Sequence, residues 1–238
     1  MSPRNATATA RQRAREQITA EIKNEARRQL AAAGAAQLSL RAVARELGMV
    51  SSALYRYFPS REELLTALII DAYDSLGERA EASGAGLPAG AVRDRWHACW
   101  HAVRDWARAS PHEYALIYGS PVPGYAAPEQ TIGPAARVPA VIGGILAEAW
   151  PPGRTAAESR EPLPGLLAGQ ADVVAAAIAP GVPAPVIART LLAWAQLFGV
   201  ISFELFGQLV GSADPADDFF GYAIGQSADQ IGLPAGGP

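Results

Sequence analysis

Two short helical segments that meet at a single glycine are the feature that most restricts how this chain can fold. Residues 40–58 place apolar side chains at helical spacing on both sides of Gly48. A glycine readily takes the positive φ that ends one helix and turns the chain sharply into the next. Ala44 is small where the two helices would cross closely. The segment is therefore predicted to fold as a helix, a tight turn and a second helix.

Helical periodicity continues through the rest of the chain, and no window alternates like a strand for long enough to build a sheet. Ser60 is placed to cap a long helix with Glu63. We predict an all-α fold in which residues 1–60 form a flexible arm and a three-helix head, and residues 61–238 form a larger bundle. A first helix over 61–83 connects the two. Further helices are expected at 18–33, 39–47, 51–58, 92–106, 114–118, 128–150, 168–179, 183–210 and 214–231.

Charge is distributed unevenly along the chain. Residues 1–63 contain eleven Lys and Arg against six Asp and Glu, whereas residues 64–238 contain nine against seventeen. A basic front part on an acidic body indicates that the front part meets a polyanion such as DNA. The alternative for any single arginine is an ordinary solvated helical face.

The second helix of the glycine-linked pair turns mostly short polar side chains outward, which allows a helix to enter a major groove. Tyr55 and Phe58 are expected in the core of the head. The candidate DNA-binding residues are Arg41, Ser51, Ser52, Ala53, Arg56, Tyr57 and Arg61. Arginines of the arm (Arg11, Arg13 and Arg15) would enter a minor groove or belong to a disordered tail.

Residues 17–68 resemble the N-terminal domain of TetR-family transcriptional regulators. The resemblance rests on Ala44, Gly48, Leu54, Tyr55, Tyr57, Phe58, the basic residue 61 and the flanking segment 60–65. Val50 stands where the family often has a capping Ser or Thr. The body resembles, more weakly, a subset with a Trp-x-x-x-His-Gly signature, in which Trp194 and Gly199 match and Phe198 replaces the histidine.

This resemblance implies a helix-turn-helix DNA-binding head and a body that binds a ligand and forms a homodimer. The expected function is a ligand-responsive regulator, most simply a repressor that a small hydrophobic or aromatic effector releases from a palindromic DNA operator. The alternative function is a helical protein that sequesters a small molecule and does not recognise DNA.

Aromatic residues of the body are candidates for the wall of an effector pocket, with ordinary core packing as the alternative. They are Trp96, Trp100, Tyr118, Trp150, Trp194 and Phe198. Helix 183–210 carries two apolar stripes, and the stripe with small residues would let a second copy approach closely; the alternative is a single buried core helix. The candidate dimer residues are Ala195, Gly199, Ser202 and Phe206.

Other classes of function find little support in the sequence. The one cysteine, Cys99, excludes an intramolecular disulfide and a Cys-based zinc cluster. His97 and His101 lie four residues apart, but no third ligand is specified, so neither a metal nor a cofactor is expected. No recognisable catalytic motif occurs, and we expect no enzyme. The longest uncharged stretch, 173–188, is short and contains prolines, so a cytoplasmic protein without a membrane span is expected.

Overall fold

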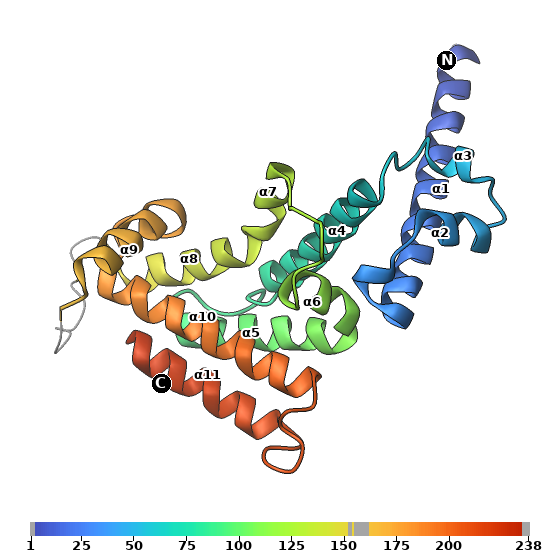
Figure 1. Cartoon of the computed structure of the whole chain (residues 1–238). Helices are drawn as coiled ribbons and strands as arrows, with labels where there is room; N and C mark the ends of the chain where they lie inside the picture. Colours follow the sequence, from blue (N-terminus) through green and yellow to red (C-terminus); the bar gives the residue numbers. More distant parts are fainter. Residues whose placement is uncertain (1–2, 152–153, 155–161, 235–238) are drawn as a thin grey trace. The chain divides into compact units, whose positions relative to one another are not determined.

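The computed structural model describes residues 3–151, 154 and 162–234, and within them every regular element is helical (Figure 1). The predicted all-α fold is confirmed. The chain divides into two compact units. The first contains residues 1–72 and 112–132, and the second contains residues 73–111 and 133–238. The predicted boundary after residue 60 stays a prediction.

The first unit is built on a long helix, α1 (Pro3–Ala33), which ends where Gly34 adopts φ 77°. Its other elements are η1 (Ala35–Gln37), α2 (Leu40–Glu46), α3 (Ser51–Leu54), the start of α4 (Arg61–Ala82), most of α6 (Pro111–Tyr118) and η2 (Glu129–Thr131). α1 packs against η1 and α2, and α2 packs against α3. The buried apolar side chains of this head are Ile22, Ala26, Leu30, Leu38, Leu40, Val43, Ala44, Leu54 and Phe58.

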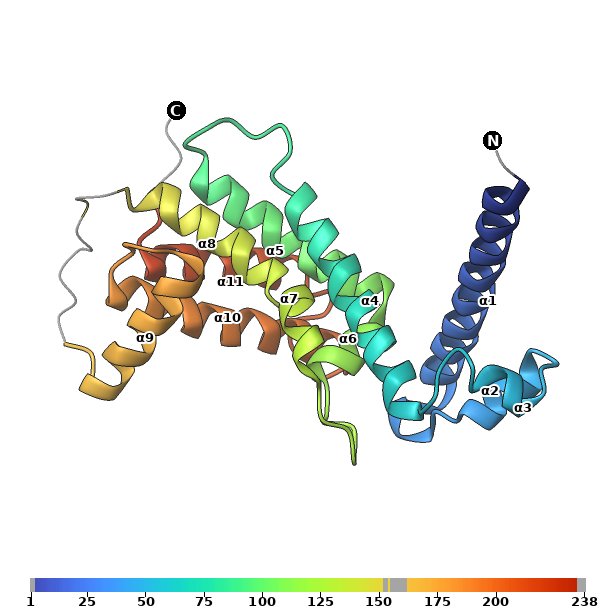
Figure 2. The ribbon, with the colours of Figure 1, turned by 90° about the horizontal axis from the view of Figure 1, so that it is seen from above.

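The beginning of α1 differs from the prediction. Residues 3–12 were expected to form a flexible arm, yet they continue the helix (Figure 2). Side-chain hydrogen bonds at i,i+4 spacing begin at the end of this segment, from Gln12 to Glu16, and continue from Gln17 to Glu21. The sequence shows no apolar period at residues 9–12 because their side chains are exposed.

The second unit is a bundle of long helices. It contains the end of α4, then α5 (Val92–Ala109), most of α7 (Ile132–Ala135), α8 (Arg137–Ala149), α9 (Gly165–Ile178), α10 (Ala184–Leu205) and α11 (Asp217–Ile231). α10 packs against α5, α9 and α11, and α8 packs against α5 and α9. α10 and α11 run antiparallel, side by side (Figure 1).

α10 ends earlier than predicted. The helix was expected to reach residue 210, but it ends at Leu205, and Gly207 follows with φ 79°. Among the described residues, α10 is long and apolar enough to cross a membrane by itself, and the bent pair 129–135 and 137–149 would be if the two are counted as one span. The packing of α10 against three other helices of the bundle explains the same apolar composition.

One glycine sets how closely α8 and α9 approach. A Cβ atom built at Gly143 would lie only 2.0 Å from the backbone oxygen of Ile178. Since real Cβ atoms do not come this close to backbone, the present α8–α9 distance requires glycine at this position. These two helices, together with α10, also bound an apolar cavity.

Candidate nucleic-acid interface and apolar cavity

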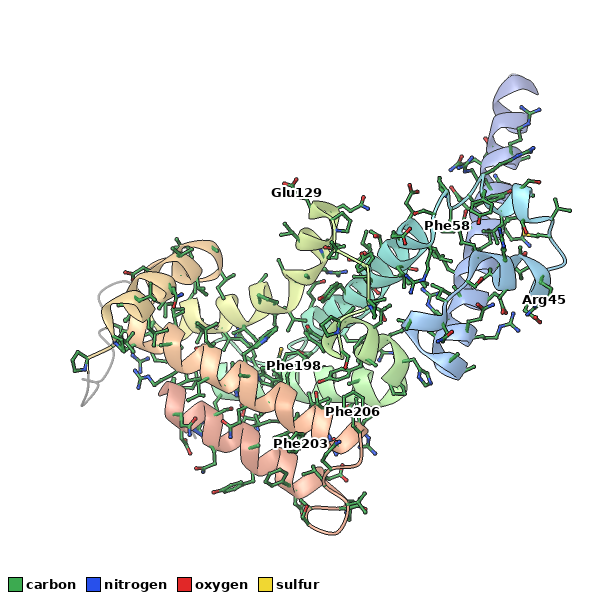
Figure 3. All side chains as sticks on the ribbon, in the orientation of Figure 1. Arg45, Phe58, Glu129, Phe198, Phe203 and Phe206 are labelled. Atoms are coloured by element: carbon green, nitrogen blue, oxygen red, sulfur yellow. The ribbon has the colours of Figure 1, made fainter. Side chains whose placement is uncertain are left out.

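The helix-turn-helix of the first unit exposes a basic and polar face. Ser39 caps α2 by accepting a hydrogen bond from the Ala42 amide, and Gly48 makes the turn with φ 64°. Val50 takes the cap position of α3 with no side-chain hydrogen bond among the described residues. The side chains of Arg41, Arg45, Ser51, Ser52 and Arg56 are exposed, whereas Ala53 and Tyr57 are half-buried. Arg45 projects from the end of α2 (Figure 3).

Two tyrosines of this motif exchange their predicted environments. Tyr55, expected in the core, is 41% exposed, whereas Tyr57, expected outward, is half-buried. The prediction assumed one continuous helix over 51–58, but α3 ends at Leu54 and a turn follows. The guanidinium of Arg15 lies 5.6 Å from the centroid of the Tyr57 ring, so Tyr57 also contacts α1. Phe58 remains buried, as expected.

Arg61 holds the head together. Its Nε donates to the carbonyl of Leu38 at 3.0 Å, and its Nη2 donates to the carbonyls of Ala35 and Ala36 at 2.8 and 3.3 Å. Ala35 and Ala36 belong to η1 and Leu38 follows it, so Arg61 links the start of α4 to this part of the head. The sequence predicts Arg61 as a phosphate ligand, but its guanidinium already donates to these carbonyls within the head.

An ion-pair network connects α1 with α4 and α6 inside the first unit. Asp71 accepts from Lys23 Nζ at 2.8 Å and from Arg27 Nη2 at 2.6 Å. Arg27 Nε also lies 2.8 Å from Glu113 Oε1. The network is half-buried, with exposed side-chain fractions between 19% and 31%. Sequence reasoning missed it because the partners lie 44 to 86 residues apart.

Four of the six predicted pocket residues form an aromatic cluster in the second unit. Trp100 meets Trp96, Trp194 and Phe198 edge to face, with ring centroids 5.4 to 5.9 Å apart. Trp96 and Trp100 are fully buried, and Trp96 Nε1 donates to Ser227 Oγ at 3.0 Å. The indole N–H of Trp100 has no hydrogen-bond partner among the described residues.

The other two predicted pocket residues make different ring contacts. Tyr118 belongs to the first unit, where its ring centroid is 5.5 Å from that of Tyr114. Trp150 follows α8 and has the guanidinium of Arg154 5.5 Å from its ring centroid. The six predicted residues are therefore divided between the two units, with Tyr118 in the first and the other five in the second, and their role as a pocket wall stays a prediction.

An apolar cavity of about 320 Å³ lies between α8, α9 and α10. Only Trp194 of the predicted pocket residues lines it. The other lining residues are Pro139, Ile142, Val173, Val174, Ala177, Ile178, Ile187, Thr190 and Leu191. Sequence reasoning missed them because aliphatic residues on three helices look the same whether they fill a core or enclose a space.

The candidate dimer residues lie on an uncovered face of α10. Ala195 and Phe206 are exposed, and Gly199 and Ser202 are half-exposed. Further large apolar side chains were missed: Leu192, Phe203, Phe219 and Tyr222, which are 39% to 65% exposed. Phe203 and Phe206 lie at the C-terminal end of α10 (Figure 3). A Cβ at Gly199 would meet no described atom within 4 Å, so this position is open.

A buried arginine anchors α10 and α11 to α5. Arg104, 3% exposed, donates from Nε and Nη2 to both carboxylate oxygens of Glu204 at 2.7 Å, and from Nη1 to Asp217 Oδ1 at 3.0 Å. Its guanidinium also lies 5.0 Å from the centroid of the Phe220 ring. These contacts raise the pKa of Arg104, the Glu204 hydrogen bonds most strongly, and Arg104 lowers the pKa of Asp217.

The two histidines of α5 lie apart from any metal-binding cluster. His101 packs edge to face against Phe220, with ring centroids 5.7 Å apart. Burial lowers the pKa of His97, and the charges of Arg93 and His101 lower it further. Among the described residues, no group of three or more His, Cys, Asp or Glu is placed to hold a metal ion.

Comparisons with known proteins agree with this architecture. Residues 22–68 match the family model described as bacterial regulatory proteins, tetR family, and residues 96–226 match the tetracyclin repressor-like C-terminal domain. The chain is 43% identical over 204 residues to the HTH-type transcriptional regulator Rv1816 of Mycobacterium tuberculosis, covering 83% of this chain and 85% of the relative. The HTH-type transcriptional regulator Mb1846 of Mycobacterium bovis matches equally well.

Solved structures show the same fold. The regulatory protein SCO4313 is 36% identical, with a TM-score of 0.75 over 92% of this chain and 98% of that one. The TetR-family regulator PfmR of Thermus thermophilus shares 16% identity, with a TM-score of 0.54 over 90% and 99% of the two chains, and supports the fold alone. This chain is not an enzyme; it belongs to the TetR family of DNA-binding transcriptional regulators.

Proposed function

We propose that this regulator is a homodimeric cytoplasmic repressor that a small apolar effector releases from a palindromic operator. The observation that carries the proposal is the presence of an exposed basic helix-turn-helix and an apolar cavity in one chain. The order of Trp194, Phe198 and Gly199 on α10 supports membership of the Trp-x-x-x-His-Gly subset, with phenylalanine in place of histidine.

In the proposed complex α3 lies in the major groove. The exposed hydroxyls of Ser51 and Ser52 are short enough to let the helix backbone approach the base edges. Arg41 and Arg56, both exposed, contact phosphates on either side. Tyr57 adds a contact from the turn after α3, and Ala53 leaves room for it. We assign Arg61 a structural role in the head, because its guanidinium donates hydrogen bonds to three backbone carbonyls.

The proposed dimer forms through the uncovered face of α10 and the neighbouring face of α11. Ala195, Gly199 and Ser202 provide a shallow strip along α10, flanked by exposed apolar side chains on both helices. Two such helix pairs related by a two-fold axis would make a four-helix interface. A dimer also supplies the two heads that specific binding to a palindrome requires.

Effector control follows from linkage between the two sites. A ligand that binds better to the DNA-free state must weaken DNA binding by the same factor by which DNA weakens ligand binding. We expect purified protein to bind the DNA upstream of its own gene, and loss of the gene to raise expression from that DNA. Lower expression in the absence of the gene would instead indicate an activator.

The DNA face is tested by fluorescence anisotropy with this upstream DNA and an unrelated duplex at two salt concentrations. Ser52→Leu should weaken specific binding by about 1–3 kcal/mol, because the larger side chain keeps α3 from the groove floor. Arg56→Ala should weaken binding to both duplexes and reduce the salt slope by about one unit. Arg79→Ala, at an exposed arginine near the end of α4, is the matched control and should change neither.

The proposal fails if folded Ser52→Leu and Arg56→Ala proteins both bind DNA like the wild type. If the wild type binds neither duplex but retains a small apolar ligand, the sequestering function takes its place.

A further inference from the structure

We infer that the cavity between α8, α9 and α10 is the binding site for an uncharged apolar molecule about two rings in size, and that the aromatic cluster is the wall behind it. The effect of this site on DNA binding rests on the proposed function, and the site and its effect are tested by separate measurements.

Burial changes steadily from the floor of this cavity to its mouth. Ile142 and Ile187 on the floor are 1% exposed, and Thr190 is 6% exposed. Leu191 and Val173 at the mouth are 40% and 71% exposed. The space therefore runs from solvent into the interior of the bundle, between helices on three sides. This is the form of a small-molecule site, whereas a protein partner needs a broad face.

The chemistry of the walls selects an uncharged ligand. Of the ten lining residues, all described, two have a polar side-chain group: the indole N–H of Trp194 and the hydroxyl of Thr190, which already donates to the Val186 carbonyl at 2.9 Å. No ionisable side chain is among these ten residues. An anion or cation that entered would lose its hydration without gaining a partner, which is strongly unfavourable. Apolar groups lose nothing by entering and gain contact with the walls.

The volume sets the size of the ligand. A dry cavity of about 150 Å³ lined by aliphatic and aromatic residues holds one benzene molecule. The present cavity, about 320 Å³, is roughly twice as large and suits a two-ring compound or an aliphatic chain of similar volume.

Trp194 joins the cavity to the aromatic cluster. It lines the cavity, and its ring centroid lies 4.7 Å from that of Phe198 and 5.9 Å from that of Trp100. A bound molecule would therefore contact an indole that is packed into the core. Energy transfer from this indole to a bound fluorophore provides a local signal of occupancy.

The test uses two dyes that share one skeleton. 2-(Dimethylamino)naphthalene is a neutral two-ring fluorophore, and 6-(dimethylamino)naphthalene-2-sulfonate is the same molecule with a sulfonate. Titration of the full-length protein should show one neutral dye per protomer, with dye emission sensitised by tryptophan. The sulfonate should bind at least about tenfold more weakly, because its charge finds no partner in the cavity. Equal affinity of the two dyes would overturn the inference.

Matched variants on α9 locate the site. Ala177→Phe places a ring in the cavity and should weaken neutral-dye binding at least about tenfold, whereas Ala176→Phe, one residue away on α9 and not part of the cavity wall, should not. Trp194→Phe should reduce the sensitised emission while dye remains bound. Equal effects of the two α9 variants would overturn the inference. Loss of dye binding as the protein dimerises would also overturn it, because a second copy would then cover the mouth of the cavity.

The same titration is repeated with operator DNA present. Release of DNA by the neutral dye, absent in Ala177→Phe, would support the proposed effector response. Dye binding that obeys the variants above but leaves the DNA complex unchanged would support the site and overturn the proposed response. The failure of one is thus distinguishable from the failure of the other.

Discussion

Replacement of Arg104 by methionine should be the most damaging single change to the ion pairs of the second unit. Methionine keeps much of the side-chain volume but removes both hydrogen bonds to Glu204 and the one to Asp217. Glu204, 16% exposed, would keep only the longer 3.7 Å contact to Arg108, whose side chain is 49% exposed. Loss of one partner from a buried ion pair costs about 3–5 kcal/mol, chiefly because the remaining charge stays desolvated.

This loss of folding stability is measured by urea or thermal unfolding, monitored by circular dichroism at one fixed protein concentration. For a chain of this length, about 3–5 kcal/mol corresponds to a decrease in Tm of roughly 6–20 °C. Arg137→Met is the matched control, since Arg137 also binds two carboxylates, those of Asp74 and Glu81, at 3.0 and 2.7 Å. These are 44% and 47% exposed, so the loss should stay near 1 kcal/mol or below.

A second substitution isolates the cause. In the Arg104→Met background, Glu204→Gln should recover part of the lost stability, because it removes a carboxylate charge that only the longer Arg108 contact still compensates, and it keeps the side-chain shape. The explanation is refuted if Arg104→Met is no more destabilising than Arg137→Met, or if Glu204→Gln destabilises the Arg104→Met protein further.

Three further predictions concern the dimer face and the interior of α5. Gly199→Leu should leave the folded protomer intact, because this position is open, but should lower dimer affinity and operator binding together; sedimentation and anisotropy check this, and a monomeric wild type with normal operator affinity would contradict it. His97 has its pKa lowered, mainly by burial, against the opposing charges of Asp94 and Asp229, so it contributes stability above about pH 6.5 that is lost as pH falls below this value. His97→Gln should flatten this part of the stability–pH profile, and an unchanged slope would refute the assignment. Burial raises the pKa of Cys99 to about 12, so a thiol reagent should label it only after unfolding, and rapid labelling of the native protein at pH 8 would show that the core opens there.

The helices were predictable where local chemistry decides their limits. Gly34 and Gly48 end α1 and α2 with positive φ, and Ser60 accepts from the Glu63 amide at the start of α4. These signals act over three or four residues and can be read directly from the sequence. The apolar residues between the helices of the head were predictable in the same way, and Val43 and Leu54 among them are fully buried.

The remaining features depend on partners that are distant in the sequence. Tyr55 follows the helical spacing of the core, but α3 ends one residue earlier and leaves it at the surface. The sequence alone predicts Arg61 as a phosphate ligand, because it does not show that Arg61 donates to the carbonyls of Ala35 and Leu38. The cavity depends on the spacing of three helices, which no local sequence pattern encodes. Its aliphatic lining residues are of the same types as ordinary core residues, so the sequence does not distinguish the two.

The close approach of α8 and α9 at Gly143 also has a consequence for how ligand preference can evolve. With alanine there, one methyl group would push the Ile178 backbone outward, and α9 would carry Val173, Val174 and Ala177 away from the opposite wall. A single codon change at Gly143 would thus widen the cavity without replacing any of the residues that line it. Related regulators with alanine at this position are expected to accept bulkier effectors while keeping the same lining.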